Sequence, residues 1–316
     1  MNKIGGNRNY GYGKQMAWAG KKALDDRYGK GHHGSSGSHE QRWKQFVYFA
    51  KSHGVNDARK IDQSLLDRYG LHLKTQVDQG EKSVSYAQNL LSTVNVVLAT
   101  MRKDKVLSIK PVQWVGQRSH IRSNIPATLE REALTIPIAQ LEAKDQTRTA
   151  LIALLARNFG LRFKEASLLN TKKAVREAKR YGKINITQGT KGGRGKDMDR
   201  WAPVNSKQIA LLKQAAELQD KAKNFIPENK TYKQWYDQAH YQWRTANRET
   251  AIKGFHDMRA AYACERYETL TGFAAPVVAG ERLASKALDQ HARTILSQEL
   301  GHGRTEVIAS YIGSSK

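Results

Sequence analysis

The chain has 316 residues, of which 53 are Lys or Arg and 29 are Asp or Glu, so its formal net charge is +24. A charge this large favours a polyanionic partner, with nucleic acid as the first candidate and a membrane surface as its competitor. No apolar run approaches the length of a membrane-spanning helix, and the N-terminus lacks the apolar segment of a signal peptide. The one cysteine, Cys264, excludes an internal disulfide framework and a cysteine-based zinc cluster. We therefore expect a cytoplasmic protein that faces DNA or RNA and has no membrane partner.

Residues 1–38 are rich in Gly, Asn, Ser and basic residues, and we interpret them as a flexible basic N-terminal arm. Within this arm the stretch from Gln15 to Tyr28 can form a short helix, whereas GKGHHGSSGS is typical of a linker. Basic runs of this kind usually stay solvated, so a DNA contact by the arm is the less favoured alternative.

Apolar residues then recur at helical spacing. In SHEQRWKQFVYFAKSHG, the residues Trp43, Phe46, Val47 and Ala50 fall at i, i+3, i+4 and i+7. Similar stripes run through DQSLLDRYGLHLKTQV and SVSYAQNLLSTVNVVLATMRKDK, which predicts a compact helical domain over residues 39–110. Basic side chains of this domain are candidates for DNA contacts, namely Arg42, Lys44, Lys51, Lys82, Arg102 and Lys103.

Residues 111–126 contain two prolines and no clear period, and we interpret them as a linker to a second domain over residues 127–316. That domain includes the strongly apolar helix DQTRTALIALLARNFG. In KINITQGT, Ile184 and Ile186 alternate with polar residues, and after the Gly-rich KGGRGKDMD the stretch RWAPV is again extended, which predicts a small hairpin or three-stranded sheet. Everything after Asn205 is typical of helix. The expected fold class is therefore mainly α with a small antiparallel sheet.

Short stretches of the second domain place polar residues among apolar ones. FGLRFKEASLL puts Arg162 and Glu165 at i and i+3, so the carboxylate can hold the guanidinium in a fixed pose. GTKGGRGKDMDR puts Lys191 at a hairpin tip, from which a flexible ammonium can reach into a groove. Taken singly, each of these residues is more typical of an ordinary surface than of a site.

Two further stretches add histidines and a tyrosine. GFHDMRAAYA places His256 and Arg259 one turn apart, ELGHGR places His302 at a helix end, and Tyr311 follows nine residues later. Arginines can bind the non-bridging oxygens of a phosphodiester, and histidines can donate hydrogen bonds or move a proton near neutral pH. Tyr311 can supply the nucleophile that this set otherwise lacks. Together the residues suit a phosphodiester site that has no acidic metal cage.

The ordered set GLRFKEASLL, TKGG, HDMR and LGHGR, with a tyrosine nine residues after the last histidine, resembles the tyrosine recombinases, that is, the phage integrases and Xer-like enzymes. The resemblance covers roughly residues 125–316. Residues 39–110 stand where this family carries a core-binding domain of SAM-like helices. The resemblance thus implies a core-binding domain followed by a tyrosine-recombinase catalytic domain.

The resemblance implies a role for each matching residue. Arg162 and Arg259 would clamp the scissile phosphate, and Tyr311 would attack it to form a 3′-phosphotyrosyl bond. Lys191 would be the general acid for the leaving 5′-oxygen. Because the reaction conserves bond energy in the covalent intermediate, it would need neither ATP nor a metal, and no cofactor is expected.

The remaining residues receive supporting roles from the same resemblance. His256 would assist proton transfer or bond the phosphate, and His302 would bond a non-bridging oxygen. Glu165 would orient its neighbours rather than take part in the chemistry. Arg194 and Lys196 lie in the same turn as Lys191, and they are further candidates for DNA contacts.

The implied partner is double-stranded DNA that carries specific attachment sites. The resemblance further implies a homo-tetramer on DNA formed from free monomers, with DNA-bending accessory proteins as possible partners. The expected task is integration or excision of a mobile element in the cytoplasm of a bacterium, at the nucleoid. A non-catalytic DNA-binding accessory protein and a DNA-relaxing enzyme of the type IB topoisomerase kind are the alternatives.

Two features depart from the family pattern. Residues 271–290 form an interval longer than in compact relatives, and we expect a loop or an additional helix there. Only IGSSK follows Tyr311, whereas many relatives exchange a longer C-terminal helix between protomers. We therefore expect the protomers to couple through a shorter segment or through another surface.

Overall fold

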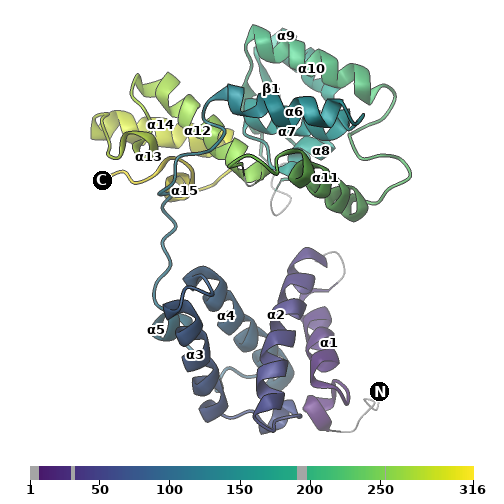
Figure 1. The fold of residues 1–316 in the computed structure, drawn as a ribbon, viewed down its shortest axis with the longest axis vertical. Helices are drawn as coiled ribbons and strands as arrows, with labels where there is room; N and C mark the ends of the chain where they lie inside the picture. Colours follow the sequence, from purple (N-terminus) through teal and green to yellow (C-terminus); the bar gives the residue numbers. More distant parts are fainter. Residues whose placement is uncertain (1–6, 30–32, 191–197, 253) are drawn as a thin grey trace. The chain divides into compact units, whose positions relative to one another are not determined.

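The structure is a computed structural model that describes residues 7–29, 33–190, 198–252 and 254–316 (Figure 1). The chain divides into two compact units, Met1–Ser119 and His120–Lys316. The division falls inside the segment expected to be a linker, and both units are mainly helical, which confirms the predicted fold class. None of the described helices is long and apolar enough to cross a membrane.

The first unit is built from α-helices joined by short turns. The long helix α4 begins where the Ser83 hydroxyl accepts a hydrogen bond from the Tyr86 N–H, and it ends at Lys103 in the left-handed conformation. The described helices of this unit are η1 (Arg8–Gly11), α1 (Met16–Tyr28), α2 (His33–Ser52), η2 (Ala58–Lys60), α3 (Gln63–Asp78), α4 (Val84–Arg102) and α5 (Pro111–Val115).

Helix α1 confirms the short helix predicted from Gln15 to Tyr28, but its packing corrects the expectation that this part of the chain belongs to a flexible arm. Its apolar face is buried in the core of the first unit, and Trp43 Nε1 on α2 donates a hydrogen bond to the carbonyl of Met16 at 2.9 Å. Gly20 permits the close approach of α1 and α2, because a Cβ at this position would lie 2.0 Å from Trp43 Nε1. Helix α2 begins at His33, inside the expected linker GKGHHGSSGS. The buried face of α1 includes small residues such as Ala19, Gly20 and Ala23, so its apolar pattern is weak in the sequence. The same small residues allow neighbouring helices to pack closely.

The predicted apolar stripes form the core of the first unit. Trp43, Phe46 and Ala50 are fully buried, and the predicted stripe of α4 is buried as well, which confirms these predictions. Helix α5 extends the unit into the expected linker, because Val115 is buried and α5 packs on α3 and α4. Burial of large apolar side chains is the main source of stability for such a unit.

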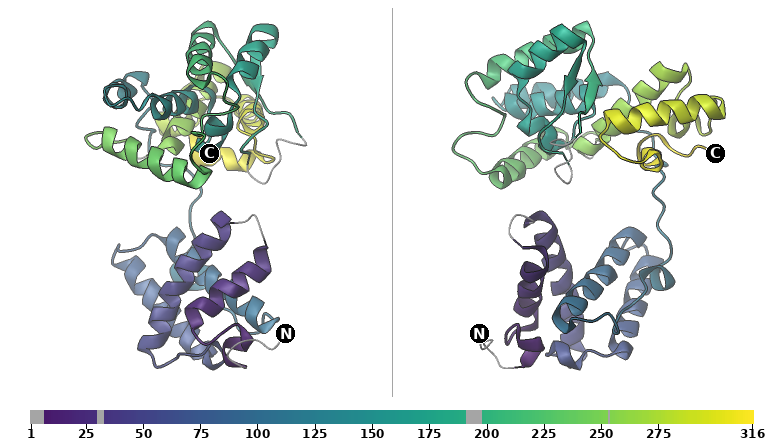
Figure 2. Two further views of the ribbon diagram at one scale, coloured as in Figure 1. Left: turned by 90° about the vertical axis from the view of Figure 1, so that its right-hand side faces the viewer. Right: turned by 180° about the vertical axis from the view of Figure 1, so that it is seen from behind.

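The second unit contains two apolar clusters. One joins α6 to α11 with the small sheet, and the other joins α12 to α15. The right-hand view of Figure 2 shows α12 to α15, coloured yellow-green to yellow, on one side of this unit and α6 to α11, coloured teal to green, on the other. The described elements are η3 (Arg131–Leu134), α6 (Thr135–Glu142), α7 (Thr147–Phe159), α8 (Phe163–Leu168), α9 (Thr171–Tyr181), β1 (Lys183–Asn185), β2 (Trp201–Pro203), α10 (Ser206–Gln219), α11 (Tyr232–Ala246), α12 (Phe255–Thr271), α13 (Pro276–Ala279), α14 (Lys286–Glu299), η5 (Thr305–Ile308) and α15 (Ala309–Ile312).

The predicted β signal corresponds to an antiparallel pair of strands. Strands β1 and β2 pair with Ile184 opposite Ala202, and both of these side chains are buried. Within the described residues the sheet has these two strands, so the hairpin form of the prediction is the one observed. The long interval at residues 271–290 contains the short helix α13 and the beginning of α14.

Candidate active site

A tight turn between α7 and α8 sets the position of Arg162. Gly160 ends α7 in the left-handed conformation with φ of 59°, and a Cβ there would lie 2.5 Å from Tyr262 Cδ1. The Glu165 carboxylate then accepts hydrogen bonds from the Arg162 backbone N–H at 2.7 Å and from Arg162 Nη1 at 2.5 Å. The predicted pairing of Arg162 with Glu165 is therefore present.

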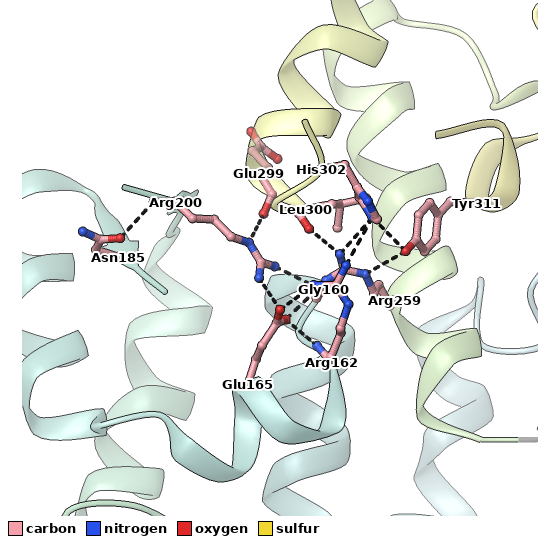
Figure 3. A network of polar contacts seen from close by, with 10 residues as sticks. All are labelled: Gly160, Arg162, Glu165, Asn185, Arg200, Arg259, Glu299, Leu300, His302 and Tyr311. Atoms are coloured by element: carbon pink, nitrogen blue, oxygen red, sulfur yellow. Dashed lines mark hydrogen bonds and ion pairs between the residues drawn. The ribbon is translucent and has the colours of Figure 1, made fainter. Parts of the chain in front are cut away.

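Glu165 is the negative centre of the site. It is fully buried, and besides Arg162 it lies 2.8 Å from Arg200 Nη1 and 3.4 Å from Arg259 Nη1 (Figure 3). Burial alone would raise the pKa of Glu165, but the positive charges of Arg200, Arg259 and Arg162 lower it to about 2. Glu165 is thus ionised at neutral pH and holds guanidinium groups from three different elements.

Arg259 lies on the first turns of α12 with its side chain fully buried. Its Nη1 donates to the Gly160 carbonyl and its Nη2 to the Leu300 carbonyl, while its Nε lies 3.2 Å from the Tyr311 hydroxyl. Desolvation, followed by the charge of Arg200, lowers the pKa of Arg259 to about 10, so it still carries its charge at neutral pH. Arg259 thereby joins the two apolar clusters of the second unit.

His302 and Tyr311 meet in this cluster of arginines. His302 Nε2 lies 3.0 Å from the Tyr311 hydroxyl, 3.3 Å from Arg259 Nη2 and 3.4 Å from Arg162 Nη2. Desolvation and the charges of Arg259, Arg162 and Arg200 lower the pKa of His302 to about 3, so the ring is neutral near pH 7. Because Nε2 of His302 faces hydrogen-bond donors, we assign the free lone pair of the ring to Nε2 and the ring proton to Nδ1.

Tyr311 is packed rather than solvated. It lies on the short helix α15, its side chain is 3% exposed, and the Cys264 thiol donates to its backbone carbonyl at 3.7 Å. The residues after it are also held, since Arg293 donates to the carbonyls of Gly313 and Ser314. The nucleophile candidate therefore sits in a fixed position.

His256 lies at the edge of the cluster. The residue is partly accessible to solvent, and its ring centroid is 5.4 Å from that of Tyr311. Desolvation by the surrounding protein, followed by the charges of Arg259 and Arg122, lowers the pKa of His256. The neighbouring Asp257 accepts a hydrogen bond from Arg122 Nη2 at 2.6 Å, and the Arg122 backbone N–H donates to the first carbonyl of α15. Arg122 therefore stabilises the position of the residue next to His256 and of the helix that carries Tyr311.

The structure thus gathers Arg162, Glu165, Arg259, His302 and Tyr311 into one network, with His256 beside it. Three further predicted residues lie outside the described residues, namely Lys191, Arg194 and Lys196.

Arg200 is the member of this network that the sequence did not single out. It immediately precedes β2, is 4% exposed, and contacts Glu165 and the carbonyl of Glu299. The sequence carried one weak signal, which is that Arg200 opens the extended stretch RWAPV. An arginine in this place is typical of the solvated end of a strand. Its burial depends on the loop around Gly301, more than a hundred positions along the chain, which no local pattern reveals.

The candidate DNA-contact residues of the first unit all lie outside its core. Two of them are ion-paired within the unit: Lys44 with Glu40 at 2.8 Å and Arg102 with Asp104 at 3.1 Å. None of the six, which are Arg42, Lys44, Lys51, Lys82, Arg102 and Lys103, is buried.

The second unit matches a known family in sequence. The sequence model of the Integrase family matches residues 121–265, a segment that includes Arg162, Glu165 and Arg259 and stops before His302 and Tyr311. No curated protein matches the chain in sequence.

Several solved structures have a similar fold. The Tn1549 transposon integrase in complex with a circular intermediate DNA has a TM-score of 0.58 at 12% sequence identity, over 95% of this chain and 96% of that chain. The site-specific recombinase XerH, bound to a palindromic difH substrate in a post-cleavage complex, has a TM-score of 0.58 at 17% identity, over 95% of this chain and 80% of that chain. A lambda integrase tetramer bound to a Holliday junction has a TM-score of 0.54 at 13% identity, over 93% and 76%. Together with the family match, this fold similarity confirms the resemblance to the tyrosine recombinases.

Proposed function

We propose that this chain, which has the fold of the tyrosine recombinases, is a site-specific DNA recombinase that cleaves and rejoins DNA through a bond between Tyr311 and a 3′-phosphate. The observation that carries the proposal is that Arg259 and His302 both contact the Tyr311 hydroxyl, while Arg162 and Arg259 both contact His302. Cationic donors around a buried nucleophile suit a reaction in which negative charge grows on a phosphate.

The arginines supply the phosphate site. Arg162 Nη2 and Arg259 Nη2 both lie near His302 Nε2, so their N–H groups point at one region of space. A phosphodiester oxygen that enters this region receives charge-assisted hydrogen bonds from two guanidinium groups. Glu165 keeps the two groups together while leaving the site with net positive charge.

The cleavage step transfers the phosphoryl group from the 5′-oxygen of the DNA to the Tyr311 oxygen. The Tyr311 oxygen attacks phosphorus, the bond from phosphorus to the 5′-oxygen breaks, and that oxygen leaves as a hydroxyl after taking a proton from the general acid, the role proposed for Lys191. His256, whose ring centroid is 5.4 Å from that of Tyr311, is the candidate acceptor for the tyrosine proton. His302 Nε2 lies 3.0 Å from the hydroxyl, but the low pKa of His302 makes it the weaker base. The negative charge of a bound phosphate would offset the arginines, so that a proton on Nε2 allows His302 to bond a non-bridging oxygen.

The first unit supplies a DNA-binding surface in this proposal. Exposed basic side chains such as Lys51 and Lys103 would contact the phosphate backbone, which makes the affinity depend on salt. We propose that four protomers act on two attachment sites, that bending proteins assist, and that the task is integration or excision of a mobile element. The tetramer is supported by the lambda integrase structure, which is that of a tetramer on a Holliday junction.

A nicked suicide substrate that carries the attachment site tests the chemistry. Wild type should give a protein–DNA adduct that survives denaturation, and Tyr311→Phe should give none, because it lacks the attacking oxygen. Tyr267→Phe is the matched control, since Tyr267 is also buried and hydrogen-bonded, to Asp289 at 2.9 Å, outside the network. An adduct that persists in Tyr311→Phe would contradict the assignment of the nucleophile.

The same protein separates the alternatives. A non-catalytic accessory protein would shift DNA in a gel without any covalent species. A topoisomerase would relax supercoiled DNA that lacks an attachment site, whereas the proposed recombinase leaves such DNA supercoiled.

A further inference from the structure

A buried cation outside the expected catalytic set lies beside the site. The backbone of Arg200 is fixed by the sheet: its N–H donates to Asn185 Oδ1 at 3.0 Å, and its carbonyl accepts from the Ile186 N–H at 2.8 Å. Its side chain leaves the sheet and is 4% exposed. Burying a guanidinium is costly unless several acceptors surround it, so its partners indicate what it holds.

Those partners come from three separate elements. Arg200 Nε donates to the Glu299 carbonyl at 2.7 Å, Nη1 lies 2.8 Å from Glu165 Oε1, and Nη2 donates to the Gly160 carbonyl at 3.5 Å (Figure 3). The end of α14, the helix α8 and the turn after α7 are thereby tied to the small sheet. A planar guanidinium can satisfy this arrangement because its donors have a fixed fork geometry.

The same elements carry the candidate catalytic groups. The Gly160 carbonyl also accepts from Arg259, and the Leu300 carbonyl, next to Glu299, is a second acceptor for Arg259. Gly301 packs directly on Arg200, since a Cβ there would lie 2.9 Å from Arg200 Cδ, and His302 follows it. A shift of Arg200 therefore moves the supports of Arg259 and His302 together.

We propose that Arg200 is a positioning residue of the phosphate site, which fixes Glu165 and the loop before His302 so that Arg162, Arg259 and His302 converge. The inference rests on the proposed function. Within the described part of the chain Arg200 makes no hydrogen bond or ion pair with Tyr311 or His302, so it acts through Glu165 and the carbonyls of Gly160 and Glu299. The charge of Arg200 adds to this role, because it is the largest positive influence that lowers the pKa of Glu165.

The test compares Arg200→Met and Arg200→Lys with the matched control Arg157→Met. Arg157 is 1% exposed, pairs with Glu265 and donates to the carbonyls of Thr128 and Leu129, so it reports the loss of a buried guanidinium elsewhere in this unit. Rates of adduct formation are measured at saturating suicide substrate, DNA affinity by fluorescence anisotropy, and folding by circular dichroism.

Arg200→Met should slow adduct formation by about 100-fold, as expected for misplaced catalytic groups, while DNA affinity stays within about threefold of wild type. Arg200→Lys should remain slow by about tenfold, because one ammonium cannot reproduce the three-way fork. Arg157→Met should keep a rate within about threefold. A normal rate in a folded Arg200 variant, or equal slowing in Arg157→Met, overturns the proposal. If Arg200→Met fails to fold, Arg200→Lys decides by the same criteria.

A second measurement does not need activity. The His302 ring is followed by NMR in DNA-free protein as pH is lowered. The charged and titratable groups that face it are Arg162, Arg259, Arg200, Glu165 and Tyr311. Arg200→Met should move both the ring signals and the titration of His302, and unchanged signals overturn the proposal. If wild type forms no adduct, the proposed function fails, while this titration still tests Arg200.

Discussion

The two units use burial in different ways. In the first unit the core is apolar, and its described buried polar residues are Asn9, Asp57, Gln88 and Thr93. In the second unit charged side chains lie inside the protein, namely Arg157, Glu165, Arg200, Arg259, Asp289, Arg293 and Glu299. The cations of the first unit lie at its surface, whereas the second unit also keeps several cations inside the protein.

This difference has an energetic consequence. A buried charge must be balanced by a partner, so each pair in the second unit is a point at which one substitution leaves a bare charge in the protein. The pair of Asp289 with Arg293 shows the pattern, since Asp289 also accepts from the hydroxyls of Tyr267 and Ser315. In the first unit Asp57 is the described buried charge, and the other weak points are cavities that a substitution in the apolar core would leave.

The largest predicted effect on stability comes from Glu165→Gln. The neutral amide would leave Arg162, Arg200 and Arg259 without their shared anion, which should cost about 4 kcal/mol of the free energy of unfolding of the second unit. Native-state hydrogen exchange on peptides from α7 measures this unit in the full chain, and peptides from α4 report the first unit.

The control for Glu165→Gln is Asp78→Asn, which removes an ion pair with Lys74 whose two side chains are 59% and 49% exposed. This substitution should change the free energy of unfolding of the first unit by less than about 0.5 kcal/mol. If Glu165→Gln were equally mild, the description of the second unit as dependent on buried charge would be wrong.

The next effect belongs to the first unit. Leu91→Ala on α4 removes a fully buried side chain and should destabilise the first unit by about 3 kcal/mol through the cavity that it leaves. Leu71→Ala, at a position 56% exposed on α3, is the control and should change little. Hydrogen exchange in α4 peptides should increase while exchange in α7 is unchanged; a similar increase in α7 would show that the units do not respond separately.

The smallest effect is a pH dependence of the second unit. The pKa of His302 falls from an ordinary 6.5 to about 3 on folding, so below pH 6.5 the unfolded chain binds a proton that the folded protein does not. The contribution is fully present above pH 6.5 and decreases as the pH falls. From pH 7 to 5 wild type should lose about 1 kcal/mol more than His302→Gln, a value reduced for the partial exposure of the ring. If wild type and His302→Gln lost the same free energy of unfolding, the assignment of a neutral His302 ring would be wrong.

The elements that could be predicted were those with a local cause. The stripe in α4 and the pair Arg162–Glu165 depend on spacings of a few residues, and both are present. Helix α1 was underestimated because its packing rests on Gly20 meeting Trp43, a contact between residues with no periodic relation.

Sequence by itself determined the residue types of the proposed site, because its arginine, histidine and tyrosine side chains can be read directly from the motifs. It also determined most helices, because their apolar periods are local. Tertiary structure alone decided that Glu165 balances three arginines, that His302 stays neutral and that Arg200 belongs to the network. Charge balance and desolvation depend on groups from α8, β2, α12 and α15 meeting in space, and no spacing along the chain encodes that meeting.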